Sequence, residues 1–198
     1  MKLRNQKSGV KRWLVTMAKY INEGKRFEED FKNSAPDYLW IHRLRDSAQS
    51  FNKSKDTDFA WDNECDFFAF DDNARILYCL ELKSTKYKSI SYQMDKNDKS
   101  SRMIKWHQIE SLTKFSEFKN IKSGLILNFR DEKNDMQRTY FMDIRDFNKA
   151  KDSCNKHSIN EIDIILNGGV KIAGSKKRVR YRWELDSFLN AMSENHNG

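Results

Sequence analysis

Three ionisable residues lie in apolar stretches of the chain, where charge is normally excluded. Asp66 directly precedes the apolar run 67–70, and Glu81 and Lys83 lie within or directly after the apolar run 76–82. Carboxylates are the ligands that hard cations such as Mg²⁺ prefer. A lysine beside such a cation suits the hydrolysis of phosphodiesters. If the fold brings the three side chains together, they form a hydrolytic metal site.

The two apolar runs predict a β-hairpin around the turn residues 71–74. Residues two apart on a strand point to the same face, so the acid and the lysine of the second strand share a face. Pairing of Phe70 with Arg75 across the turn places Asp66 opposite Cys79 on that face, where directly opposed Cβ atoms lie about 5 Å apart. Glu-x-Lys is also common on exposed strands as an ordinary salt bridge. The apolar context favours the metal site.

Other acids near the hairpin offer alternatives to Asp66. They are Asp58, Asp62 and Glu64. Asp66 is preferred because it alone begins the apolar strand on the required face.

Composition indicates a single basic domain, residues 1–198. The chain has 37 Lys and Arg against 29 Asp and Glu, a net charge of +8. This balance suits a polyanionic partner such as DNA, and it also fits a merely soluble basic protein. The three cysteines form no Cys-x-x-Cys motif, so neither a disulfide framework nor a zinc site is indicated. With no signal peptide or long apolar run, we expect a cytoplasmic protein that does not enter the membrane.

Hydrophobic periodicity predicts alternating helices and strands around the hairpin. A Ser158-x-x-Glu161 capping box begins one of the helices, which ends at 167–169. A basic segment, 174–183, precedes the last helix. The predicted elements are a helix over 10–31, a strand at 38–41, a polar loop at 45–58, the hairpin, a helix over 101–116, strands at 125–130 and 138–144, two helical stretches, and a helix over 184–192.

Four short motifs in order resemble one family within the PD-(D/E)XK nuclease superfamily, the RecU Holliday junction resolvases. The similarity covers about residues 20–190. The motifs are Gly24 to Glu28, Asp66, Glu81-Leu82-Lys83-Ser84, and Trp106-His107-Gln108-Ile109-Glu110 followed by the glycine-led strand at Gly124. The chain departs from the family in two places. Its acid lies in Glu64-Cys65-Asp66-Phe67 rather than Thr-Thr-Asp, and the stretch that includes the family's stalk is short, with 45–60 as a reduced stalk.

The resemblance implies a fold and a set of roles. The fold is α/β, a restriction-endonuclease-like core with a mixed central sheet flanked by helices. Lys83 orients or deprotonates the attacking water, and Gln108 holds the scissile phosphate or a metal water. His107 is left out of the catalytic set, because a lone histidine is more often structural. The implied ligands of Mg²⁺, for which Mn²⁺ can substitute, are Asp66, Glu81, the carbonyl of Leu82, and Glu28 with Glu29 as its alternate.

The resemblance also implies a substrate, the four-way DNA junction of recombination and repair. Resolution needs two symmetric nicks, so a homodimer is expected. Two alternatives stay open: a general or sequence-specific nuclease on the same fold, and a non-catalytic DNA-binding or strand-pairing protein. The candidate DNA contacts are Arg43, Arg45, Lys86, Lys88, Lys176, Lys177, Arg178 and Arg180.

Overall fold

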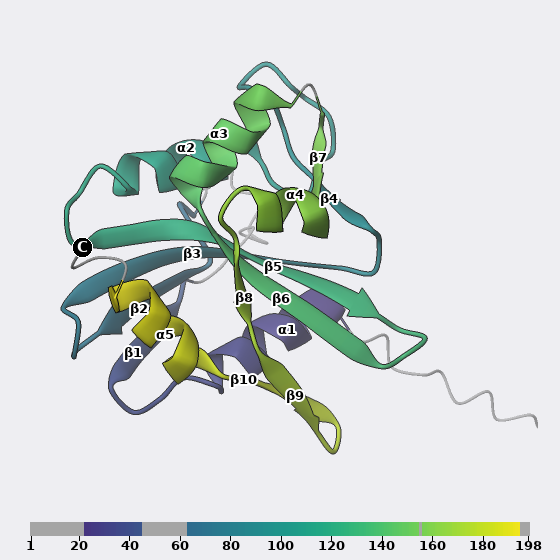
Figure 1. Cartoon of the computed structure of the whole chain (residues 1–198). Coiled ribbons are helices and arrows are strands. Elements are labelled where there is room, and N and C mark those ends of the chain that lie inside the picture. The colour runs from purple at the N-terminus through teal and green to yellow at the C-terminus, as the bar shows by residue number, and fades with distance from the viewer. Residues whose placement is uncertain (1–21, 45–62, 155, 195–198) are drawn as a thin grey trace, which may run out of the picture.

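A computed structural model describes residues 22–44, 63–154 and 156–194 of the chain (Figure 1). Several predictions fall outside these ranges: the polar loop at 45–58, the stalk at 45–60, the DNA contact at Arg45, the alternative acids Asp58 and Asp62, and the helix over 10–31 as far as residue 21. None of the helices in the described ranges is long and apolar enough to cross a membrane.

Five helices and ten strands are described. In chain order they are α1 (Glu23–Lys32), β1 (Leu39–Arg43), β2 (Phe67–Asp71), β3 (Ile76–Thr85), β4 (Ser89–Ser91), α2 (Trp106–Phe115), β5 (Ile121–Asp131), β6 (Met136–Asp143), α3 (Ile144–Ser153), β7 (Ser158–Asn160), α4 (Glu161–Leu166), β8 (Val170–Ile172), β9 (Gly174–Lys177), β10 (Arg180–Trp183) and α5 (Leu185–Glu194).

Six of the strands form one mixed sheet in the order β1-β2-β3-β5-β6-β8. β1, β2 and β3 are antiparallel neighbours, β3 and β5 are parallel, and β5, β6 and β8 are again antiparallel. The helix α2 makes the crossover between the parallel strands β3 and β5, as such a connection requires. The predicted fold class, a mixed central sheet flanked by helices, is therefore confirmed.

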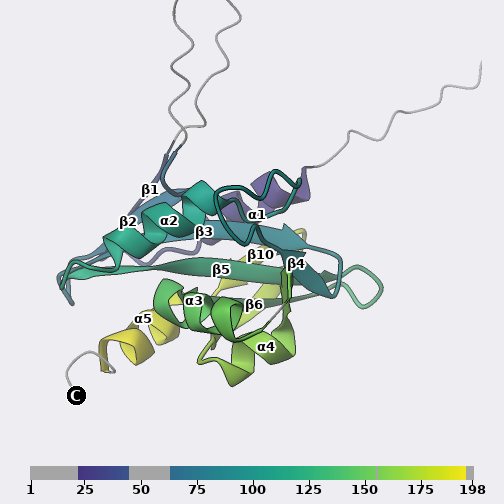
Figure 2. The same cartoon turned by 90° about the horizontal axis from the view of Figure 1, so that it is seen from above.

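Helices cover both faces of this sheet (Figures 1 and 2). α1 and α5 pack on one face, where Phe27, Phe31 and Phe188 join the core. α2, α3 and α4 lie on the other face, over a second core that includes Cys79 and Leu125. Because β3 and β5 are covered on both sides, their sequences are nearly continuous apolar runs rather than alternating ones.

The central hairpin differs from the prediction in register. Phe70 pairs with Leu77 rather than Arg75, so β2 runs one residue further, to Asp71, and β3 begins one residue later, at Ile76. The side chain of Asp71 accepts hydrogen bonds from the backbone of the turn at 2.9 and 3.0 Å, and Arg75 takes a left-handed conformation with φ of 56°. A shift of two residues preserves the faces of a strand, so Asp66 still lies on the predicted face.

The last third of the chain also differs from the prediction in detail. Ser158 belongs to the short strand β7, which pairs with β4. The helix α4 begins instead at Glu161 and is capped by Asn160. The side chain of Asn160 accepts from the backbone N–H of Asp163, and the carboxylate of Asp163 accepts from the backbone N–H of Asn160. The basic segment 174–183 is not a simple lead into the last helix, because it forms the antiparallel hairpin of β9 and β10.

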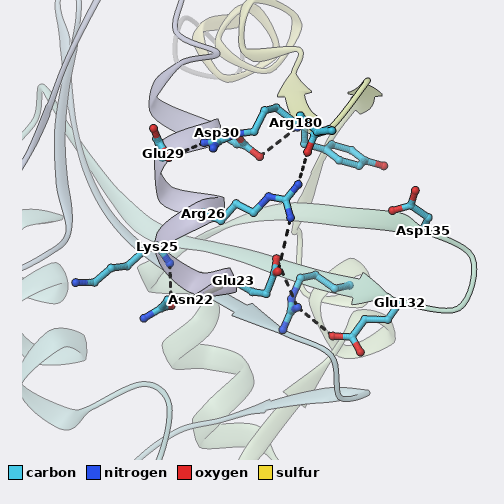
Figure 3. Close-up of polar contacts among 12 residues, drawn as sticks. Asn22, Glu23, Lys25, Arg26, Glu29, Asp30, Glu132, Asp135 and Arg180 are labelled. Carbon is cyan, nitrogen blue, oxygen red and sulfur yellow. Dashed lines mark hydrogen bonds and ion pairs between the residues drawn. The ribbon is translucent and has the colours of Figure 1, made fainter. Parts of the chain in front are cut away.

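The β9–β10 hairpin is fastened to α1 by buried charge (Figure 3). Asp30 is 4% exposed. It accepts a hydrogen bond from Arg180 and another from the backbone N–H of Tyr181 at 3.1 Å. Glu29 accepts from the same guanidinium at 2.7 Å. The hairpin therefore holds the C-terminal half of α1 against the sheet.

Candidate active site

Asp66 lies at the start of β2, and the backbone of two other strands fixes it there. Its N–H donates to the carbonyl of Leu80 at 3.1 Å, and its own carbonyl accepts from Leu44 at 2.8 Å. Its side-chain Oδ2 accepts from the backbone N–H of Leu82 at 2.7 Å. The carboxylate thus accepts a backbone hydrogen bond of β3 that a neighbouring strand would otherwise accept. This bond holds the carboxylate of Asp66 beside the middle of β3.

Glu81 lies in the middle of β3 and is 1% exposed. Its Oε1 accepts hydrogen bonds from Lys83 Nζ and from Gln108 Nε2, both at 2.5 Å. Its Oε2 is buried and has no hydrogen-bond partner among the described residues. Such an unsatisfied buried acceptor is costly and uncommon in folded proteins, so it points to a ligand at this position.

The electrostatics of Glu81 support the same conclusion. Burial raises the pKa of Glu81 to about 8, the charge of Lys83 opposes that rise, and the carboxylate of Asp66 adds to it. The carboxylate of Asp66 therefore lies near that of Glu81, and the two negative charges repel each other. Two carboxylates are both acceptors, so at neutral pH they need a proton or a cation between them.

Gln108 is held in one orientation by its place in the first turn of α2. Its Oε1 accepts from the backbone N–H of Lys105 at 2.9 Å, which completes the start of the helix. This contact leaves the amide nitrogen to donate to Glu81. The structure therefore brings together four predicted site residues: Asp66, Glu81, Lys83 and Gln108.

Glu28 comes from α1, which packs on the other face of the sheet from α2. Its carboxylate accepts from Arg43 Nε at 2.5 Å at the end of β1. Arg43 also donates to the carbonyl of Leu44 at 3.2 Å, and Leu44 donates to the backbone of Asp66. Glu28 therefore reaches Asp66 through a chain of hydrogen bonds. Its direct role as a metal ligand stays a prediction.

The donor set fits Mg²⁺ with two protein carboxylates. Within the described ranges, no three His, Cys, Asp or Glu side chains are grouped to hold a metal. Mg²⁺ does not need three, because it usually takes one or two carboxylates and keeps several waters. Asp66 and the unpartnered Oε2 of Glu81 meet this requirement. Leu82 supplies its N–H to Asp66, and its carbonyl stays a predicted ligand.

The predicted DNA contacts divide into paired and exposed residues. Arg180 binds Glu29 and Asp30, and Arg43 binds Glu28. Lys176 binds Asp135. Figure 3 labels Glu29, Asp30 and Asp135. A cation already neutralised within the protein gains less from a phosphate. The exposed candidates that form no ion pair within the described residues are Lys86, Lys88, Lys177 and Arg178.

Sequence reasoning missed the surroundings of the acids. Cys65 and Cys79 lie at the base of the site, both buried. A hydrogen bond between the two thiols and burial both raise the pKa of Cys65, so it stays a neutral, unreactive thiol. Cys65 precedes β2 and Cys79, on β3, pairs with Phe68, so strand periodicity alone does not place the two thiols together. Of the rival acids, Glu64 is exposed, while Asp58 and Asp62 fall outside the described residues.

No protein-family model matches the chain. A comparison with curated proteins finds the SPbeta prophage-derived uncharacterized protein YotM of Bacillus subtilis strain 168. The two are 33% identical over 184 residues, which cover 86% of this chain and 87% of YotM. The chain belongs to the YotM family. The alignment covers most of both chains, so the comparison extends well beyond one motif.

Proposed function

We propose that this protein is a Mg²⁺-dependent DNA endonuclease that selects branched, four-way junctions. The observation that carries the proposal is the buried Oε2 of Glu81, which lacks a hydrogen bond although it lies beside a second carboxylate and a lysine. A purely structural ion pair would satisfy both oxygens of a buried acid. An acid pair that awaits a cation leaves one oxygen open.

Asp66 and Glu81 would hold the cation, with the carbonyl of Leu82 as a further ligand. When bound, Mg²⁺ supplies positive charge that offsets the charge on a scissile phosphate. Binding would also relieve the repulsion between the two carboxylates. Through this repulsion Asp66 contributes to the raised pKa of Glu81.

Lys83 and Gln108 support this acid pair in different ways. Lys83 is 18% exposed, so its ammonium reaches the surface while it donates to Glu81. It would face the phosphate and orient an attacking water, or deprotonate that water after losing its own proton to become the neutral amine. Gln108 fixes the orientation of Glu81 through its amide. A carboxylate held by two donors on one oxygen keeps the other oxygen directed at the ligand.

The preference for junctions rests on the resemblance to the RecU resolvases, and the homodimer rests on the two-fold symmetry of the substrate. Light scattering at micromolar concentration should give about twice the 23.6 kDa chain mass. A monomeric particle that still makes paired symmetric nicks would contradict the dimer.

The test is cleavage of labelled four-way junction and matched linear duplex, each with Mg²⁺ or EDTA. Asp66→Asn should abolish Mg²⁺-dependent cleavage and leave junction binding nearly intact, because the amide keeps the shape but loses the anionic ligand. Asp72→Asn is the matched control, since Asp72 lies in the exposed turn of the same hairpin and pairs with Arg75.

The alternatives give different results in this assay. A general nuclease of the same fold cuts linear duplex as readily as the junction. A non-catalytic DNA-binding protein binds both and cuts neither. Cleavage by Asp66→Asn at the wild-type rate would refute the assignment of the site.

A further inference from the structure

A second site opens at the end of β3, beyond the acid pair. It is a cavity of about 680 Å³, a size typical of ligand pockets. Three connections form its walls: residues 86–88 after β3, the β5–β6 hairpin, and the start of α4. None of the roles proposed for the acid pair uses this cavity.

The cavity and the acid pair lie on the same face of the sheet. In the parallel ladder of β3 and β5, Glu81 pairs with Leu125 and Thr85 pairs with Phe129. Residues that alternate along these strands share a face, so Phe129, which lines the cavity, points to the same side as Glu81 and Lys83. From Lys83 to Tyr87 the chain spans at most about 13 Å, which is about four nucleotides along one strand of duplex DNA.

The cavity presents an aromatic ring and an apolar wall to solvent. Tyr87 is 70% exposed and Ile162 is 67% exposed. The ammonium of Lys86 lies 6.0 Å from the centre of the Tyr87 ring, a cation–π contact. A large exposed ring beside cations is the arrangement on which unpaired bases stack in proteins that bind single strands.

The charge that the cavity offers to a ligand is positive. Its acids are already bound within the protein: Glu161 to Arg138 and Glu132 to Arg130, while Asp131 accepts from the backbone of its own turn. In contrast, the exposed lysines of its rim form no ion pair with any residue of the described ranges. These lysines are Lys86, Lys88 and Lys133.

We propose that this cavity binds one unpaired nucleotide of the DNA strand, with its base on Tyr87 and its neighbouring phosphates on the rim lysines. The inference rests on the proposed nuclease function, because that function makes DNA the ligand. It adds that the protein recognises an unpaired nucleotide of this DNA. Bases within a duplex are stacked on both faces and cannot offer a face to Tyr87, whereas a base next to the branch point loses a stacking neighbour and unpairs at lower cost.

The test measures binding without cleavage, in EDTA. Fluorescently labelled single-stranded dT decamer and a duplex decamer are titrated with the full chain. Tyr87→Ala should weaken binding of the single strand roughly 5- to 150-fold, because one base–aromatic stack is lost, and should change duplex binding less than twofold. Tyr87→Phe keeps the ring and should bind as the wild type does.

The matched control is Phe118→Ala, which removes another exposed ring, 61% exposed and outside the cavity. The inference is overturned if Tyr87→Ala binds the single strand like the wild type, if it weakens duplex binding equally, or if Phe118→Ala has the same effect. Because the assay needs no cleavage, it is separate from the nuclease test. If the chain binds single strands through Tyr87 but never cuts DNA, the result supports this inference and refutes the proposed nuclease function.

Discussion

Replacement of Glu81 by Gln should change the pH dependence of folding in the metal-free protein. The pKa of Glu81 is about 8 in the folded chain, against an ordinary value of 4.5. The folded state therefore takes up a proton on Glu81 that the unfolded state has already lost at neutral pH. Stability from this group is complete below pH 4.5 and is lost as the pH rises towards 8.

The size of the effect follows from the same two values. Between them, stability should fall by about 1.4 kcal/mol for each pH unit, which amounts to about 3 kcal/mol at pH 7. Glu81→Gln has no titrating proton, and its amide oxygen can still accept from Lys83 and Gln108. The variant should equal the wild type near pH 4.5 and exceed it in stability by about 3 kcal/mol at pH 7.

Urea unfolding in EDTA at several pH values measures this difference. Glu110→Gln is the control, because Glu110 is an exposed acid on α2 that pairs with Lys114. Saturating Mg²⁺ should stabilise the wild type increasingly as the pH rises, because protons compete with the cation for Glu81. Parallel pH profiles for the wild type and Glu81→Gln between pH 5 and 8 would refute the electrostatic argument for the site.

Three further predictions follow from the described contacts. Lys83→Ala should abolish Mg²⁺-dependent cleavage, measured by gel assay, but leave the junction Kd within a few-fold of wild type, measured by anisotropy on the same preparation. Cleavage near the wild-type rate would remove Lys83 from the mechanism. Joint replacement of Lys177 and Arg178 by Ala should lower the slope of log K against log salt by about two, if both contact phosphates, and an unchanged slope would make them ordinary surface charges. Arg180→Ala should destabilise the chain by about 3 kcal/mol in chemical denaturation, because it leaves the buried carboxylate of Asp30 without its charged partner; a loss below about 1 kcal/mol would show that the backbone N–H of Tyr181 suffices.

Much of the acid pair was predictable because strand periodicity is a local property. The faces of Asp66, Glu81 and Lys83 depend only on whether their spacing is odd or even. An error of two residues in the hairpin register therefore left the prediction intact. The helix with Gln108 was also predictable, although α2 begins at Trp106 rather than at 101.

The partners of the surface charges were not predictable from local patterns. Arg180 lies in a basic run that reads as a DNA-binding or solvated surface, yet it binds acids about 150 positions earlier in the chain. Glu28 and Arg43 were assigned to a metal and to DNA, and the structure pairs them with each other. Such pairings depend on how α1 and the last hairpin meet across the sheet, which periodicity does not encode.

The contact between α1 and the β9–β10 hairpin has a consequence for the order of folding. The residues of the acid pair and Gln108 lie within about 40 positions of one another, whereas Arg180 and Asp30 are separated by 150. Closing the longer loop costs more chain entropy, so the contact with α1 should form late. During synthesis the segment 63–131 emerges well before β10. The strands that carry the acid pair can therefore pair first, and α1 is secured only when the C-terminal hairpin has emerged.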